Sequence, residues 1–139
     1  MLPLMYGRYF KLNSREKEVT RPLSLEAVLA AINDAVISID TEGAIGYMNV
    51  VAERLTGWSL DTAAGLPLQQ VFNVVNERGC PETELASRCL KSGETVSALG
   101  FEQVLLNRDG IGVAIEQSYT PLIDGEGRVE GAVVVFRDV

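Results

Sequence analysis

Two pairs of carboxylates are the residues in this sequence best suited to acid–base chemistry. Glu82 stands two residues before Glu84, and Asp124 stands two residues before Glu126. General acid–base catalysis needs such groups inside a cleft, whereas both pairs lie beside turn signals and are typical of solvated surface charge. The chain contains no histidine, which excludes Ser-His-Asp and Cys-His catalysis as well as histidine-ligated haem. We therefore predict no catalytic residues and no enzymatic activity for this chain.

The two cysteines, Cys80 and Cys89, are the other reactive groups. Two thiols nine residues apart, without a histidine, do not make a zinc site, so we predict no metal site. We expect two reduced thiols in a cytoplasmic protein, with Cys89 in the core. A redox pair is the alternative, and it would require Cα atoms close enough to be bridged.

The segment NVVAERLTGW, from Asn49 to Trp58, is rich in helix-boundary residues. Asn49 follows a predicted strand and precedes a predicted helix, so its amide could cap the helix, bond to a neighbouring strand or reach a ligand. Gly57 can end the helix in the left-handed conformation. Trp58 is the single tryptophan, and we expect it to be a hydrophobic wedge at this corner, with packing beside a flavin as the alternative.

Several polar side chains elsewhere could contact a ligand. Ser118 and Thr120 lie in the middle of a predicted strand and could offer hydroxyls to a cleft. Glu116 and Gln117 point to opposite faces because strand side chains alternate, and the sequence does not decide which of them faces inward. Three arginines could bind a carboxylate but are expected to be solvated: Arg54, Arg88 and Arg108.

Length and charge limit the class of protein. The chain has 139 residues, enough for one domain with a buried core. Its net charge of −7 leads us to expect no nucleic-acid partner and no direct membrane contact. The longest apolar run, GAVVVF, is far below the roughly 20 residues of a membrane span. We expect residues 1–21, which are mixed and basic, to form an N-terminal extension and residues 22–139 to form the domain.

Hydrophobic periodicity predicts an α+β domain. An amphipathic helix is expected over 22–34 from an apolar stripe at helical spacing: Leu25, Val28, Leu29 and Ile32. β-Branched runs predict strands at 35–40 and 44–49, and strand patterns return at 98–110, 111–122 and 128–139. Short helical patterns lie between these two groups of strands, at 49–57, 59–65, 67–76 and 80–93.

Three turn sequences share one template, with Asp or Asn first and Gly fourth: DTEG (40–43), NRDG (107–110) and DGEG (124–127). The first side chain can bond to its own backbone, and the glycine can take a positive φ. Hairpin-like connections of this kind favour an antiparallel sheet. Five strands in one sheet, with short helices covering one face, would leave room for a pocket between the two layers.

The sequence resembles the PAS domains of bacterial signalling proteins, over about residues 24–139. The opening and closing segments carry the resemblance: AVISIDTEGAIGYMNVVAERLTGWSLDTAAG and EGRVEGAVVVFRDV. Two further segments resemble a subgroup joined to diguanylate cyclases, cyclic-di-GMP phosphodiesterases and histidine kinases: PLQQVFNVVNERG and IEQSYTPLIDGEGRV. The resemblance implies a five-stranded antiparallel sheet in the order 2-1-5-4-3 and a ligand cleft between the sheet and the central helices.

The same resemblance narrows the choice of cofactor. PAS domains that bind haem often use a histidine of the central helices, so the lack of one disfavours haem. Photoreactive flavin domains carry a cysteine in the motif GxNCRFLQ, and Leu68 stands at that position in GLPLQQVF, which excludes the photochemical adduct. We expect a filled core without a cofactor, and a small organic ligand or non-covalently bound FAD are the alternatives. Residues expected to line the space are Ile37, Ile39, Met48, Asn49, Leu55, Trp58, Val71, Leu85, Cys89, Phe101, Ser118 and Val135.

The resemblance also predicts a role in signalling. We expect a module that dimerises and passes the state of a ligand or partner to a C-terminal output domain, either a cyclic-di-GMP enzyme or a histidine kinase. The dimer would form through the helix at 22–34 and through the sheet. Asp138 belongs to the Asp-Val that precedes the family's signalling helix, and we expect it to anchor that junction by capping or by a salt bridge. A scaffold without a ligand, or a flavin-binding redox sensor, is the alternative.

Overall fold

The computed structural model of the chain describes residues 33–98 and 103–139. The predicted helix with Leu25, Val28, Leu29 and Ile32, and also Phe101, lie outside the described residues. The described elements follow the chain as β1 (Ala35–Ile39), β2 (Ile45–Met48), α2 (Val50–Thr56), α3 (Leu60–Ala63), α4 (Leu68–Val71), β3 (Asn73–Val75), α5 (Leu85–Ser92), β4 (Val96–Ser97), β5 (Gln103–Leu106), β6 (Gly112–Ile123) and β7 (Val129–Asp138).

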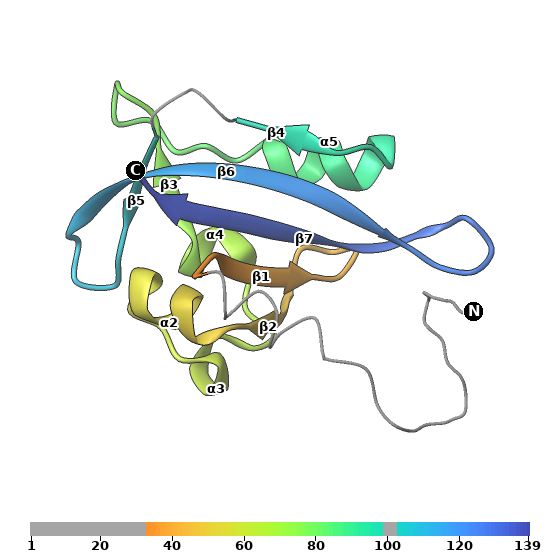
Figure 1. Cartoon of the computed structure of the whole chain (residues 1–139), viewed down its shortest axis with the longest axis horizontal. Helices are drawn as coiled ribbons and strands as arrows, with labels where there is room; N and C mark the ends of the chain where they lie inside the picture. Colours follow the sequence, from red (N-terminus) through yellow and green to blue (C-terminus); the bar gives the residue numbers. More distant parts are fainter. Residues whose placement is uncertain (1–32, 99–102) are drawn as a thin grey trace.

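The strands form one antiparallel sheet (Figure 1). Helices α2 to α5 contribute buried side chains to a single core with the inner face of this sheet. The strand order is β2-β1-β7-β6-β5-β3, and β4 pairs with β6 outside this path. The predicted antiparallel sheet with short helices is therefore confirmed, but the predicted count of five strands is wrong, because the described residues hold seven. The five predicted strands follow one another as β2-β1-β7-β6-β5, and the two additional strands are short.

The additional strand β3 corrects the helix predicted over 67–76. Helix α4 ends at Val71, and Phe72 leaves it with φ −101° and ψ 78°. The residues that follow pair with β5, with Asn73 opposite Leu106 and Val75 opposite Val104. Val74 and Val75 are β-branched, and such side chains lose less conformational freedom on a sheet than in a helix. The helical spacing of the apolar residues in 67–76 did not indicate that the backbone changes from helix to strand after Val71.

The template of the turns is confirmed and occurs once more than predicted. In the turn after β1, Asp40 Oδ1 accepts hydrogen bonds from the backbone N–H groups of Glu42 and Ala44, at 2.9 and 3.0 Å. The turn that starts at Asn76 has the same geometry, since its Oδ1 accepts from Arg78 at 2.9 Å and from Cys80 at 3.0 Å. Gly79 takes a φ of 78° there. The sequence NERG fits the template, although it lies within the region of the chain that the sequence predicts to be helical.

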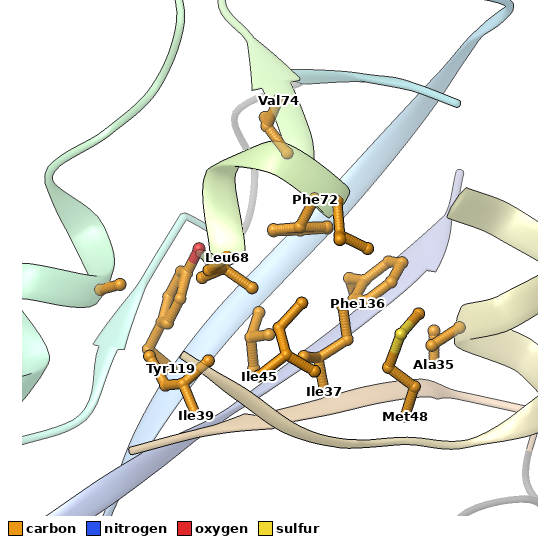
Figure 2. Close-up of a cluster of buried hydrophobic side chains, with 14 of the residues drawn as sticks. Ala35, Ile37, Ile39, Ile45, Met48, Leu68, Phe72, Val74, Tyr119 and Phe136 are labelled. Atoms are coloured by element: carbon orange, nitrogen blue, oxygen red, sulfur yellow. The ribbon is translucent and has the colours of Figure 1, made fainter. Parts of the chain in front are cut away.

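The core lies between the inner face of the sheet and the helices (Figure 2). Alternate residues of the neighbouring strands β1 and β7 face inward, and five of them are at most 1% exposed: Ala35, Ile37, Ala132, Val134 and Phe136. The ring of Phe136 meets the ring of Phe72 with 4.5 Å between their centroids. Burial of such side chains contributes about 1.5–3 kcal/mol each, so this layer provides much of the stability of the fold.

Candidate functional site

Most of the predicted apolar pocket residues lie together in the core. Six of them are buried in one cluster between the sheet and the helices: Ile37, Ile39, Met48, Val71, Leu85 and Cys89. Leu55 and Trp58 are half-buried and pack against that cluster. The sequence therefore identified side chains from both layers that share one space.

Ser118 and Val135 lie on the opposite face of the sheet, so their expected location was wrong. They are directly paired across β6 and β7, and their neighbours in the chain, Gln117, Val134 and Phe136, are the ones buried on the inner face. Side chains of a strand alternate between faces, which places Ser118 and Val135 outside. There they help to line a hollow of ≈ 190 Å³ together with Asp34, Phe136 and Arg137.

Asn49 lies at the corner between β2 and α2, and both the oxygen and the nitrogen of its side-chain amide form hydrogen bonds. Its Oδ1 accepts from the N–H of Ala52 at 2.9 Å, which caps α2, and from the N–H of Val36 at 3.0 Å. Its Nδ2 donates to the carbonyl of Asp34 at 2.8 Å. The side chain is 2% exposed. Of the three roles considered for Asn49, helix capping and strand bonding are both seen and occur together.

Trp58 follows directly after the end of α2. Gly57 ends the helix with a φ of 78°, and the half-buried indole then packs against the core. The guanidinium of Arg108 stacks over the indole at 4.1 Å from the ring centroid, and the N–H of Arg108 donates to the carbonyl of Thr56 at 2.8 Å. The corner after α2 is thereby joined to the β5–β6 turn, a contact that the sequence did not suggest.

Gln117 is the functional candidate that sequence reasoning left undecided. It is 1% exposed on the inner face, and its Nε2 donates to Oε1 of Gln103 on the neighbouring strand β5. Its own Oε1 is buried and accepts no hydrogen bond from the described part of the chain. Glu116 faces outward, and its carboxylate pairs with Arg137 at 3.3 Å. Strand alternation predicted that one of the two would face inward, but only the fold decides which.

Two ionisable groups on the inner side are held neutral. Burial raises the pKa of the Cys89 thiol. Burial, assisted by the charge of Glu82, also raises the pKa of the Tyr119 hydroxyl far above its ordinary value. The prediction that Cys89 is a free thiol in the core is confirmed, and Cys80 is a free thiol at the surface. A neutral buried thiol is a poor nucleophile.

The inner space is closely filled in the described part of the structure. A hollow of ≈ 10 Å³ lies where Tyr119 approaches α4 and α5, beside Leu68, Phe72 and Ala86. A water molecule needs about that volume or more.

A larger hollow of ≈ 560 Å³ opens at the surface beside α5 and β4, and it is lined by Arg88, Lys91, Ser92, Glu94, Thr95, Val96 and Ser97. The described residues contain no group of side chains that could hold a metal ion.

The end of β7 is exposed. Asp138 pairs through its backbone register with Ile115, and its carboxylate has no ion pair with the residues described in the structure. The ion pair seen at this end is instead the one between Arg137 and Glu116.

No helix in the ranges 33–98 and 103–139 is long and apolar enough to cross a membrane.

Comparison with known proteins gives one family. A protein-family model described as PAS fold matches residues 23–139. The chain is 33% identical over 115 residues to the probable diguanylate cyclase DgcE of Escherichia coli K12, which covers 83% of the chain and 10% of that protein. It is 30% identical over 111 residues to the cyclic di-GMP phosphodiesterase PdeB of Shewanella oneidensis MR-1, which covers 80% of the chain and 12% of that protein. The chain thus spans about a tenth of the length of these curated relatives.

Solved structures show the same fold. The PAS domain of nitrogen regulation protein NR(II) from Vibrio parahaemolyticus matches with a TM-score of 0.65 and 23% identity, over 84% of this chain and all of that one (100%). At this identity the likeness concerns the arrangement of the backbone and carries no ligand or partner with it.

Proposed function

Because this chain belongs to the PAS fold family, we propose that it is the regulatory module of a bacterial signal-transduction protein and relays the state of a ligand or partner to an output domain of the full-length protein. The output would be a cyclic-di-GMP enzyme or a histidine kinase, and catalysis would reside there. The observation that carries the proposal is the family match over most of the chain, together with similarity to two proteins of cyclic-di-GMP metabolism.

The ends of the described domain support a relay. β1 and β7 are neighbouring antiparallel strands, and Ala35 near the start lies opposite Phe136 near the end. The start of β1 and the end of β7 therefore lie at the same end of the sheet. A ligand or partner can shift such a junction only through a difference in its affinity for two arrangements of the domain. Both β1 and β7 carry buried side chains on the inner face, so a change in the core would reach the start of β1 and the end of β7.

Asp138 is the proposed relay residue. It is exposed at the end of β7, where its carboxylate is available to a following helix. Asp138→Asn in the full-length protein is expected to reduce the response of output activity to the signal while leaving the melting temperature of the domain unchanged. Equal loss in melting temperature and output would show that Asp138 only supports the fold.

A homodimer through the helix predicted at 22–34 and the outer face of the sheet is the proposed assembly. The outer face of β1 and β7 carries three valines, since Val36, which is 4% exposed within the single chain, lies opposite Val135, and Val133 lies two residues away opposite Ser38. Antiparallel sheets usually present polar residues on a solvated face. We expect Val135→Glu to shift the sedimentation of the chain from dimer to monomer, with Val50→Glu, at an exposed valine of helix α2, as the matched control. A wild-type chain that sediments as a monomer at high micromolar concentration would refute the dimer.

A scaffold that binds partners without a ligand is the second candidate, and the filled inner space favours it. The described core also leaves no room for a flavin ring system unless several side chains move, so the residues present do not fit FAD in this arrangement. Absorbance and native mass spectra of freshly purified chain discriminate among these alternatives. A visible band would indicate flavin or haem, an added mass of a few hundred daltons would indicate an organic ligand, and neither would favour the scaffold.

A further inference from the structure

We propose that the buried carboxamide of Gln117 is the polar contact for an uncharged small ligand, which donates a hydrogen bond from an N–H or O–H group to Gln117 Oε1. The inference rests on the proposed regulatory function and specifies the chemistry of a ligand in the space between the sheet and the helices.

The unsatisfied oxygen is the first observation. Gln117 is 1% exposed, and its Nε2 is engaged by Gln103. Its Oε1 is buried without a partner in the part of the chain that the structure describes. Buried polar atoms in folded proteins are nearly always hydrogen-bonded, because an unmet acceptor is destabilising. The neighbouring inward positions on β6, Ile115 and Tyr119, show that this strand accepts large apolar and aromatic side chains at such sites.

The surroundings of Gln117 determine the charge of the ligand. Among the described residues, the buried polar or charged side chains are Asn49, Thr56 and Gln117. None of them carries a charge, and an unpaired ion in such a place is strongly disfavoured. Gln117 lies directly opposite Phe136 on β7, and Phe136 in turn contacts Phe72 of the helical layer. A flat, largely apolar molecule with one donor suits these aromatic neighbours.

The close packing gives the ligand a means of regulation. The hollow described on the inner face, beside Phe72 and Tyr119, measures ≈ 10 Å³, so a ligand must displace side chains that join α4 and α5 to the sheet. Interiors packed this closely respond by moving between discrete arrangements. Binding at Gln117 would thus favour a second arrangement of the helices on β6 and β7, the strands that lead to the proposed relay.

Isothermal titration of the full chain with donor-bearing and donor-blocked probes tests the inference. Indole and phenol supply one N–H or O–H donor on a flat apolar body, and N-methylindole and anisole lack it. We expect saturable binding of at least one donor-bearing probe. Its affinity should fall about tenfold for the blocked counterpart, and by a similar factor in Gln117→Leu, since one hydrogen bond is lost in either case.

Three results would overturn the inference: no saturable binding by either donor probe, equal affinity for blocked and unblocked probes, or unchanged affinity in Gln117→Leu. The comparison of blocked with unblocked probes uses the wild-type chain, so that part of the test does not depend on the folding of a variant. The control variant Gln70→Leu changes an exposed glutamine of α4 and is expected to bind like wild type. If binding fails while the chain dimerises and Asp138→Asn still uncouples output, the regulatory function stands and only the ligand site is wrong.

Discussion

The two buried carboxamides in the described part of the domain, Asn49 and Gln117, differ in how completely the fold satisfies them. Asn49 accepts from two backbone N–H groups and donates to a carbonyl. Gln117 donates to Gln103, and its buried oxygen has no partner in the described ranges. Both side chains are at most 2% exposed, so the difference is one of hydrogen bonding and not of burial. We infer that Asn49 supports the fold and that Gln117 is available for function.

Removing the satisfied amide is expected to have the largest effect. Asn49→Leu would leave the N–H groups of Val36 and Ala52 and the carbonyl of Asp34 without their partner. We expect the free energy of unfolding to fall by about 3 kcal/mol, since loss of a cap alone costs about 1 kcal/mol and each orphaned buried group adds to it. Urea unfolding of the purified chain measures this. Asn73→Leu, at an exposed asparagine, is the control, and equal losses in the two variants would contradict the structural role.

Alkaline pH is expected to lower the stability of the domain through two buried neutral groups, the thiol of Cys89 and the hydroxyl of Tyr119. Burial raises the pKa of the Cys89 thiol above 9.0 and that of the Tyr119 hydroxyl above 10.0, their ordinary values. Because both pKa values are raised in the fold, the unfolded chain ionises first. The stability that the neutral groups contribute is therefore complete below pH 9.0 and declines as the pH rises above it.

Urea midpoints at about pH 8 and about pH 10.5 measure this decline. Tyr119→Phe has no hydroxyl to ionise and is expected to show a shallower decline than wild type. A decline of the same steepness in the variant would mean that Tyr119 does not contribute.

Removing the unsatisfied amide is expected to have a smaller effect of opposite sign. Gln117→Leu replaces a buried orphan acceptor with an apolar side chain of similar size. We expect the free energy of unfolding of the ligand-free chain to rise by about 1 kcal/mol, although Gln103 then loses its donor. Thermal unfolding followed by circular dichroism, with Gln70→Leu as the control, measures the change. A loss comparable to that of Asn49→Leu would show that both amides are structural.

The contact that joins the corner near Asn49 to the β5–β6 turn is expected to have the smallest effect. Arg108→Ala removes the cation over Trp58 but keeps the backbone bond to Thr56. Exposed cation–π pairs contribute about 0.5–1 kcal/mol, and we expect a loss in that range with a change in tryptophan fluorescence. Arg78→Ala changes an arginine in the similar turn at Asn76 and should have no effect on fluorescence. Unchanged fluorescence in Arg108→Ala would refute the stacking.

The sequence predicted the elements that depend on local rules. Asn49 and Gly57 bound α2 as expected, because capping and left-handed φ are properties of a few neighbouring residues. Three of the four described Asx–Gly turns were predicted for the same reason. β3 was missed because its pairing with β5 depends on residues about thirty positions away. A helical pattern of apolar residues cannot report a partner at that distance.

The candidate site was predicted only in its apolar part. Ile37, Val71 and Cys89 were placed correctly because large apolar side chains collect in a core whatever the register. Ser118 and Val135 were placed on the wrong face, since a shift of one residue in the phase of a strand exchanges its faces. Because Ser118 was expected to face inward, its neighbour Gln117 was not expected to line the pocket. The inward position of Gln117 follows from the pairing of β6 with β7.

The most direct measurement follows the side-chain amide signals of the two residues by NMR while indole is added to the folded chain. If Gln117 is open to a ligand donor and Asn49 is closed, the NH₂ signals of Gln117 will shift saturably and those of Asn49 will stay in place. If the signals of Gln117 do not move, or both residues shift alike, the two buried amides have the same role and the distinction between fold and site is wrong.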